Sequence, residues 1–134
     1  MIDEKIKALI SYRLEQAKEA LRAAEILLKD ELLTSAINSA YYAMFYAVLA
    51  LLAAEKKETS KHSGAISLFD KDYVKKGIFP KELSRWLHDA FDLRQRSDYA
   101  VQYVPSREEA EEIINQAVSF VSHVSEKLRE ETGG

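Results

Sequence analysis

Apolar residues recur along the first half of the chain at spacings that predict two long helices. In residues 3–29 they alternate at intervals of four and three, which gives one continuous amphipathic seam. Residues 35–55 are apolar on nearly every side and rich in Ala, so we expect this helix to be central, with Thr34 as its N-cap. The first helix should therefore pack antiparallel to the second.

Start and stop signals predict two further helices. Residues 63–76 form the third, which ends at Gly77 because glycine readily adopts the left-handed conformation of a helix C-cap. Pro80 opens the fourth, which runs to about Tyr99. Polar residues separate these helices, and no linker between them is long enough to divide the chain into domains.

The fifth helix is predicted from a capping box formed by Ser106 and Glu109. We expect residues 1–129 to form a single helical domain and residues 130–134 to fray. Strand-like alternation of apolar and polar residues does not compete with this pattern. The predicted fold is an all-α, up-and-down helical bundle of about five helices.

Length and composition exclude several classes of function. A chain of 134 residues with net charge −3 holds a core unaided, but it lacks the broad basic surface of a duplex-DNA binder, so any contact with RNA must be local. Without Cys, and with no His or carboxylate cluster at zinc spacing, we expect no cofactor and no metal. Residues 40–54 are too short and too polar to span a bilayer, which favours a cytoplasmic protein.

A charged pair, Arg94 and Asp98, falls on the apolar stripe of the fourth predicted helix. Leu83, Leu87 and Phe91 lead into this pair at helical spacing. A charge on a buried face must be paired or functional. Two interpretations stay open: an ion pair at i,i+4 that merely completes the helix, or a functional site.

Two other polar groups are candidate nucleotide- or RNA-binding residues. Asn38 and Tyr42 lie one turn apart on the second helix, where their polar tips can enter a groove and the ring can stack on an RNA base. Lys61, His62 and Ser63 open the third helix, where backbone N–H groups and the helix dipole favour an anion such as phosphate. The structural alternatives are a packed tyrosine with a backbone partner and ordinary N-capping by a serine.

Four segments, in order, resemble the HEPN domain family in its small prokaryotic branch, and together they span most of the chain. They are residues 39–45 (Ser-Ala-Tyr-Tyr-Ala-Met-Phe), 61–64 (Lys-His-Ser-Gly), 77–83 (Gly-Ile-Phe-Pro-Lys-Glu-Leu) and 93–99 (Leu-Arg-Gln-Arg-Ser-Asp-Tyr). The resemblance implies a helical bundle that forms a homodimer. In many members of the family it also implies a metal-independent endoribonuclease. The motif of these members is an arginine and a histidine with four to six residues between them.

Arg94 matches the family's arginine, but the histidine does not carry over. The positions where it should fall are Tyr99, Ala100 and Val101. Metal-free RNA cleavage needs a group that takes the 2′-hydroxyl proton, a donor to the leaving oxygen and a cation on the phosphate. Asp98 or Tyr99 would have to act as the base, and a phenol with a pKa near ~10 is a poor one. The departure therefore argues against nuclease activity.

The resemblance also implies a partner, a minimal nucleotidyltransferase in a toxin–antitoxin pair. It makes Tyr99 a candidate acceptor of a transferred nucleotide. We predict a HEPN-type protein that interacts with RNA or a nucleotide, with Arg94, Asp98 and Tyr99 as its candidate catalytic residues. The alternative is a non-catalytic, dimeric helical interaction module in which Arg94 and Asp98 are structural.

Overall fold

The computed structural model describes residues 3–59, 61–99 and 103–132, except the side chains of residues 97–99. Its elements are α1 (Glu4–Lys29), α2 (Leu33–Ala54), α3 (His62–Phe69), a π-helical turn η1 (Asp70–Val74), α4 (Lys81–Tyr99) and α5 (Arg107–Thr132). No strand occurs among these residues, so the predicted all-α fold is confirmed.

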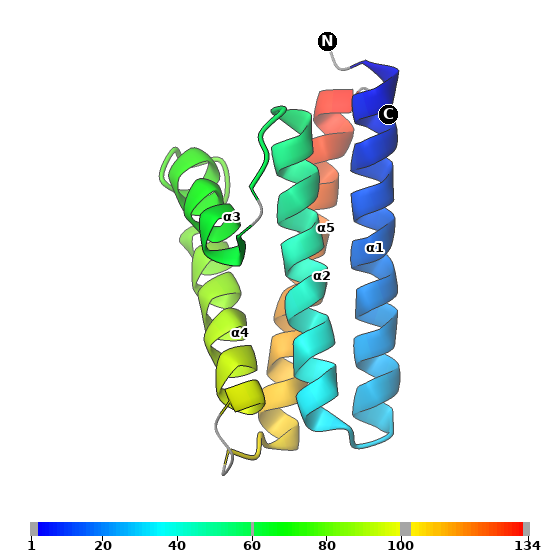
Figure 1. Cartoon of the computed structure of the whole chain (residues 1–134), viewed down its shortest axis with the longest axis vertical. Helices are drawn as coiled ribbons and strands as arrows, with labels where there is room; N and C mark the ends of the chain where they lie inside the picture. Colours follow the sequence, from blue (N-terminus) through cyan, green and yellow to red (C-terminus); the bar gives the residue numbers. More distant parts are fainter. Residues whose placement is uncertain (1–2, 60, 100–102, 133–134) are drawn as a thin grey trace.

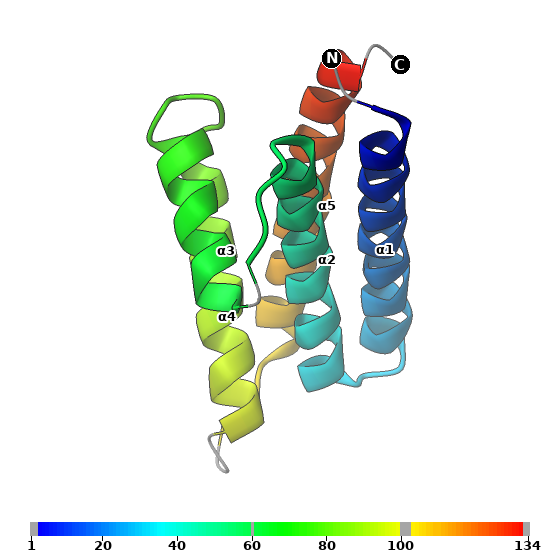
Figure 2. The ribbon, with the colours of Figure 1, turned by 45° about the horizontal axis from the view of Figure 1, so that its top comes forward.

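The long helices α1, α2, α4 and α5 run alternately down and up the bundle (Figure 1). Helices α3 and α4 lie on the side of α2 that faces away from α1, and a second view shows the same arrangement (Figure 2). The start of α1 and the end of α5 lie at the same end of the molecule. The predicted up-and-down bundle is therefore present, with α3 and η1 inserted between α2 and α4.

Helix α2 is the central helix, as its composition predicted, and it contacts each of the other four α-helices. Its alanines 36, 40, 43, 47 and 50 are fully buried, so neighbouring backbones can approach closely. By length and hydropathy α2 would also pass as a membrane span, with a mean hydropathy of 1.5. Since 72% of that window is buried inside the bundle, these apolar side chains form the protein core.

Two predicted helix ends differ from the structure. Thr34 is not the N-cap of α2, because the chain turns back immediately after α1 and α2 begins at Leu33. Glu31 adopts a left-handed conformation with φ 62°, and the Leu32 amide donates to the Leu27 carbonyl at 2.9 Å, which closes this tight turn. At the other terminus α5 continues to Thr132, three residues into the segment that we expected to fray.

The third predicted helix is interrupted where Asp70–Val74 forms the π-helical turn η1. A π-helical turn holds an extra residue and shifts the direction of the side chains that follow it. In η1 the buried carboxylate of Asp72 pairs with Lys57, and this hydrogen bond lowers the pKa of Asp72. The chain then leaves the helix at Gly77, whose φ of +78° confirms the predicted left-handed cap.

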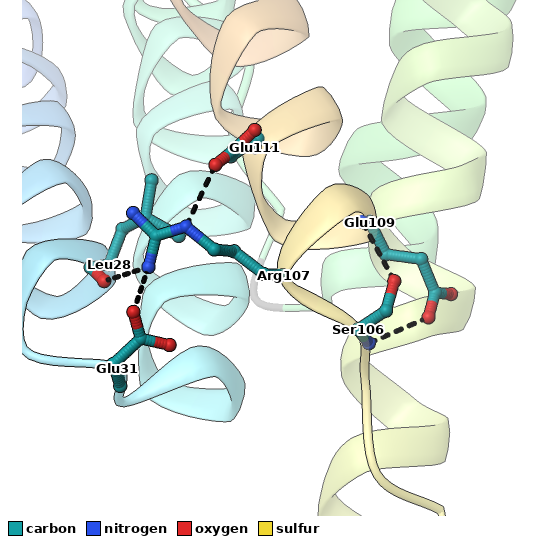
Figure 3. Close-up of polar contacts among 6 residues, drawn as sticks. All are labelled: Leu28, Glu31, Ser106, Arg107, Glu109 and Glu111. Atoms are coloured by element: carbon teal, nitrogen blue, oxygen red, sulfur yellow. Dashed lines mark hydrogen bonds and ion pairs between the residues drawn. The ribbon is translucent and has the colours of Figure 1, made fainter.

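The capping box at the start of α5 is confirmed (Figure 3). The Glu109 amide donates to Ser106 Oγ at 3.0 Å, and the Ser106 amide donates to Glu109 Oε1 at 2.9 Å. Beside it Arg107 donates to the Leu28 carbonyl at 3.2 Å and pairs with Glu31. The start of α5 is therefore tied to the turn between α1 and α2.

Candidate functional site

Arg94 of α4 contacts two polar side chains of α2. Its Nε donates to Asn38 Oδ1 at 2.8 Å, and its Nη2 donates to the Tyr42 hydroxyl at 3.3 Å. The guanidinium carbon also lies 5.2 Å from the ring centroid of Tyr42 and 5.5 Å from that of Tyr41, within range of a cation–π interaction. The structure thus joins three residues that the sequence placed in two separate candidate groups.

The side chains of Asp98 and Tyr99 lie outside the described residues, although α4 extends through both positions. Pairing between Arg94 and Asp98, and a chemical role for Tyr99, therefore stay predictions. The contacts from Arg94 to α2 reach across 52 and 56 residues of sequence. Spacing within α4 gave no signal for them.

His62, the first residue of α3, lies in the same group of side chains. Its ring stacks on Phe45, with centroids 4.1 Å apart and planes inclined by 3°. Its Nδ1 is 2.7 Å from the hydroxyl of the fully buried Tyr41, whose ring also faces Arg94. We call the set formed by Asn38, Tyr41, Tyr42, Phe45, His62 and Arg94 the Arg94 cluster.

The remaining candidates of the third helix, Lys61 and Ser63, are exposed on either side of His62. Lys61 occupies the N-cap position of α3 and makes no side-chain capping bond, whereas its amide donates to Thr59 Oγ1 at 3.3 Å. A Cβ on Gly64 would lie 2.5 Å from this same Thr59 oxygen, so a larger residue there would force the Thr59 side chain to shift. This close turn fixes the place of His62 against α2.

Burial and charge set the protonation states inside the cluster. Burial, and then the nearby positive charge of Arg94, lower the pKa of His62 below its ordinary value of 6.5. Burial raises the pKa of the Tyr41 hydroxyl, although Arg94 opposes this effect. At neutral pH the cluster therefore holds an uncharged imidazole, a protonated phenol and a guanidinium cation. Such a set can accept a proton close to a bound anion.

A surface groove of about 710 Å³ between α1 and α2 adjoins this cluster. Asn38, Tyr42 and Tyr46 of α2 line it, together with Gln16 and Glu19 of α1. Asn38 and Tyr42 also accept the hydrogen bonds of Arg94, so a molecule in the groove would contact the partners of Arg94 directly. Asn38 and Tyr42 thus line a groove, while their role in binding a ligand there stays a prediction.

Sequence reasoning missed a second polar group at η1 and α4. Ser84 donates to Asp70 Oδ1 at 2.7 Å, and His88 Nε2 lies 2.6 Å from Asp70 Oδ2. The residues are 14 and 18 positions apart, and only the packing of η1 on α4 brings them together. Across the described ranges, no three His, Asp or Glu side chains form a group that could hold a metal ion.

Comparison with known proteins gives a consistent result. The model of the HEPN domain matches residues 10–128. A UPF0332 protein of Thermotoga maritima is 39% identical over 130 residues, which cover 97% of each chain. Two proteins of Methanocaldococcus jannaschii also match, "Putative toxin MJ0605" and "Putative toxin MJ0142". They are 37% and 32% identical, covering 96% and 86% of this chain and 92% and 78% of their own lengths.

Proposed function

Because the chain belongs to the HEPN domain family, we propose that it is a toxin-like protein whose Arg94 cluster binds single-stranded RNA. The observation that carries this proposal is the position of Arg94, whose guanidinium is held between Asn38 and two tyrosine rings. A guanidinium suits a phosphate because it offers several N–H donors in one plane. The names of two relatives, "Putative toxin MJ0605" and "Putative toxin MJ0142", support the biological class.

The surroundings of Arg94 favour a single strand over a duplex. Aromatic rings can stack on unpaired bases, and Tyr42 and Tyr46 both line the groove beside Arg94. The net charge of −3 is consistent with one local phosphate contact and not with an extended basic surface. These features together support a short, unpaired RNA segment as the ligand.

The test is binding of a short, labelled single-stranded RNA in EDTA, with 2′-O-methyl groups to prevent cleavage. Arg94→Ala should weaken binding and make the slope of log K against log salt less negative by about 0.7, the value of one lost phosphate contact. Arg85→Ala is the matched control, because Arg85 is exposed on α4 nine residues away, on the opposite side of the helix. Equal binding by the two variants would contradict the proposal.

One observation favours a second function: the hydrogen bonds of Arg94 join α4 to α2. In this alternative the chain is a non-catalytic helical interaction module, and Arg94 only holds its geometry. Arg94→Ala should then lower the free energy of unfolding by about 3 to 5 kcal/mol, as expected when one partner of a buried pair is removed. Urea unfolding of the same variants separates the two functions, since RNA binding predicts a smaller loss for the partly exposed Arg94.

We also propose that the protein acts as a homodimer beside a minimal nucleotidyltransferase, which the family resemblance implies. In a dimer, two Arg94 clusters could contact one RNA strand. The family resemblance makes Tyr99, which follows Arg94 on α4, the candidate acceptor of a nucleotide from that partner. The proposed partner is defined by the reaction that it catalyses, which is the transfer of a nucleotide from ATP to a phenol hydroxyl.

A further inference from the structure

We propose that His62 is the proton acceptor of the Arg94 cluster, so that this chain cleaves RNA although no histidine follows Arg94 at the family's spacing. The inference rests on the RNA-binding function proposed above. Its structural basis is that α3 brings an imidazole, from 32 residues earlier in the chain, to the tyrosines that surround Arg94.

The ring of His62 is held in one orientation by two independent contacts. Phe45 stacks flat against it at 4.1 Å, and the Tyr41 hydroxyl lies 2.7 Å from its Nδ1. Tyr41 itself cannot move freely, because it is fully buried and packs against Phe91 of α4. A fixed ring plane and a fixed hydrogen bond are what a proton-transfer group needs, since geometry decides which atom of the substrate it can reach.

The other ring nitrogen of His62, Nε2, makes no hydrogen bond to the described residues, and the residue as a whole is half-buried. An RNA bound at Arg94 can therefore approach Nε2, while Tyr41 keeps Nδ1 occupied.

The charged and titratable groups that face His62 come from three elements. Helix α2 contributes Tyr41 and Tyr42, α4 contributes Arg94, and α3 contributes its N-terminal dipole, with Lys61 at the N-cap position. The positive charge of Arg94 and the positive end of the helix dipole disfavour the imidazolium form. In the tautomer with the proton on Nδ1, that N–H donates to the Tyr41 hydroxyl and leaves a free lone pair on Nε2.

The proposed reaction is an internal transfer within RNA. His62 Nε2 takes the proton of a 2′-hydroxyl, and the 2′ oxygen forms a bond to the adjacent phosphorus. The bond from phosphorus to the 5′ oxygen breaks, and that oxygen takes a proton from water. The products are a 2′,3′-cyclic phosphate and a 5′-hydroxyl, and the imidazolium then returns its proton to solvent. Arg94 stabilises the negative charge that develops on the phosphate oxygens.

Two other histidines serve as comparisons. His88 is exposed on α4 and pairs with Asp70, and His123 contacts the Ser119 carbonyl on α5. Neither stacks on an aromatic ring in the described structure, and neither shares a contact residue with Arg94 there. His88→Gln is therefore the matched control for His62→Gln.

The experiment measures cleavage of a short RNA in EDTA between pH 5 and pH 8, with the products identified by mass. Wild-type protein should give a rate that rises with pH and levels off once the imidazole is unprotonated. His62→Gln should cleave at least about 100-fold more slowly and lose this inflection, as expected when a general base is removed. His88→Gln should keep the wild-type profile. Binding of 2′-O-methyl RNA by His62→Gln should change far less than its cleavage rate.

The outcomes separate this inference from the function on which it rests. If wild-type protein binds the 2′-O-methyl RNA but leaves the cleavable RNA intact, RNA binding stands and the role of His62 is wrong. A His62→Gln variant with the wild-type rate and pH profile would also overturn it. If wild-type protein binds no RNA, both proposals fall together.

A second variant covers the case in which His62→Gln does not fold. Tyr41→Phe keeps the aromatic ring and removes only the hydroxyl that holds Nδ1. It should slow cleavage, because Nδ1 loses the contact that holds the ring, and it should move the inflection of the pH–rate profile, because a hydrogen bond at one ring nitrogen changes the proton affinity of the imidazole. An unmoved inflection in a folded Tyr41→Phe protein would contradict the proposed role of His62.

Discussion

The protein has two aromatic clusters, and they differ in the polar groups that accompany the rings. In the first, the rings of Phe69, Tyr73, Phe79 and Phe120 have centroids 5.2 to 6.0 Å apart, and all four side chains are buried. Its one hydroxyl, on Tyr73, donates to the Leu51 carbonyl at 3.1 Å. We call this set the Phe69 cluster, and its polar atom is satisfied within the fold.

The Arg94 cluster has a similar number of rings but a different polar content. Tyr41 is fully buried, whereas Tyr42, Phe45 and His62 remain half-buried. A guanidinium and an imidazole take the places that further apolar side chains would fill. Aromatic packing alone therefore does not identify a site in this fold. A site is identified by aromatic packing that includes half-buried side chains with hydrogen-bonding atoms.

Removing a ring from each cluster gives the largest expected effects. Phe69→Ala should lower the free energy of unfolding by about 3 to 5 kcal/mol, because it empties space in a fully buried position. Phe45→Ala should cost less, because one side of this half-buried ring faces His62 near the surface. Urea unfolding at pH 7 measures both, and equal losses would show that the two clusters are equally part of the core.

The periodicity of apolar residues and the helix start and stop signals predicted most of the architecture, because these signals are local in the sequence. The capping box of Ser106 and Glu109, the left-handed Gly77 and the central place of α2 all depend on residues within one or two turns of each other. The start of α2 was misplaced at Thr34 because the conformation of Glu31 closes the preceding turn early. No residue type signals that conformation as strongly as glycine would.

The candidate site was predicted in parts and not as a whole. Arg94, Asn38 and Tyr42 were each singled out, yet their contact depends on how α4 packs on α2. The pairing of His62 with Tyr41 spans 21 residues and follows from where α3 begins beside the middle of α2. Local periodicity carries no information on contacts between residues so far apart in the sequence. His62 was therefore assigned only to a helix N-terminus.

Removing a single hydroxyl from each cluster should have a smaller effect on stability. Tyr73→Phe and Tyr41→Phe should each lower the free energy of unfolding by about 0.5 to 1.5 kcal/mol, the net value of one hydrogen bond. They should differ in a second measurement, the NMR titration of His62. Tyr41→Phe should shift the pH at which His62 titrates, whereas Tyr73→Phe should leave it unchanged, since Tyr73 bonds the Leu51 carbonyl instead. A shift in both variants would mean that the clusters are coupled.

The smallest expected effect is a pH dependence of stability that comes from His62. Its pKa is lowered in the folded protein, so between pH 6.5 and that lower value the unfolded chain binds more protons than the folded one. Stability from this group is therefore complete above pH 6.5 and is lost as pH falls through the folded pKa.

The measurement is urea unfolding from pH 7.5 to pH 5 for wild type and His62→Gln. The difference between the two curves isolates His62, because the other histidines are present in both proteins and ordinary carboxylates titrate near pH ~4. Parallel curves would mean that burial beside Arg94 does not disfavour the charged imidazole, and the Arg94 cluster would then lose the neutral base on which its proposed chemistry depends.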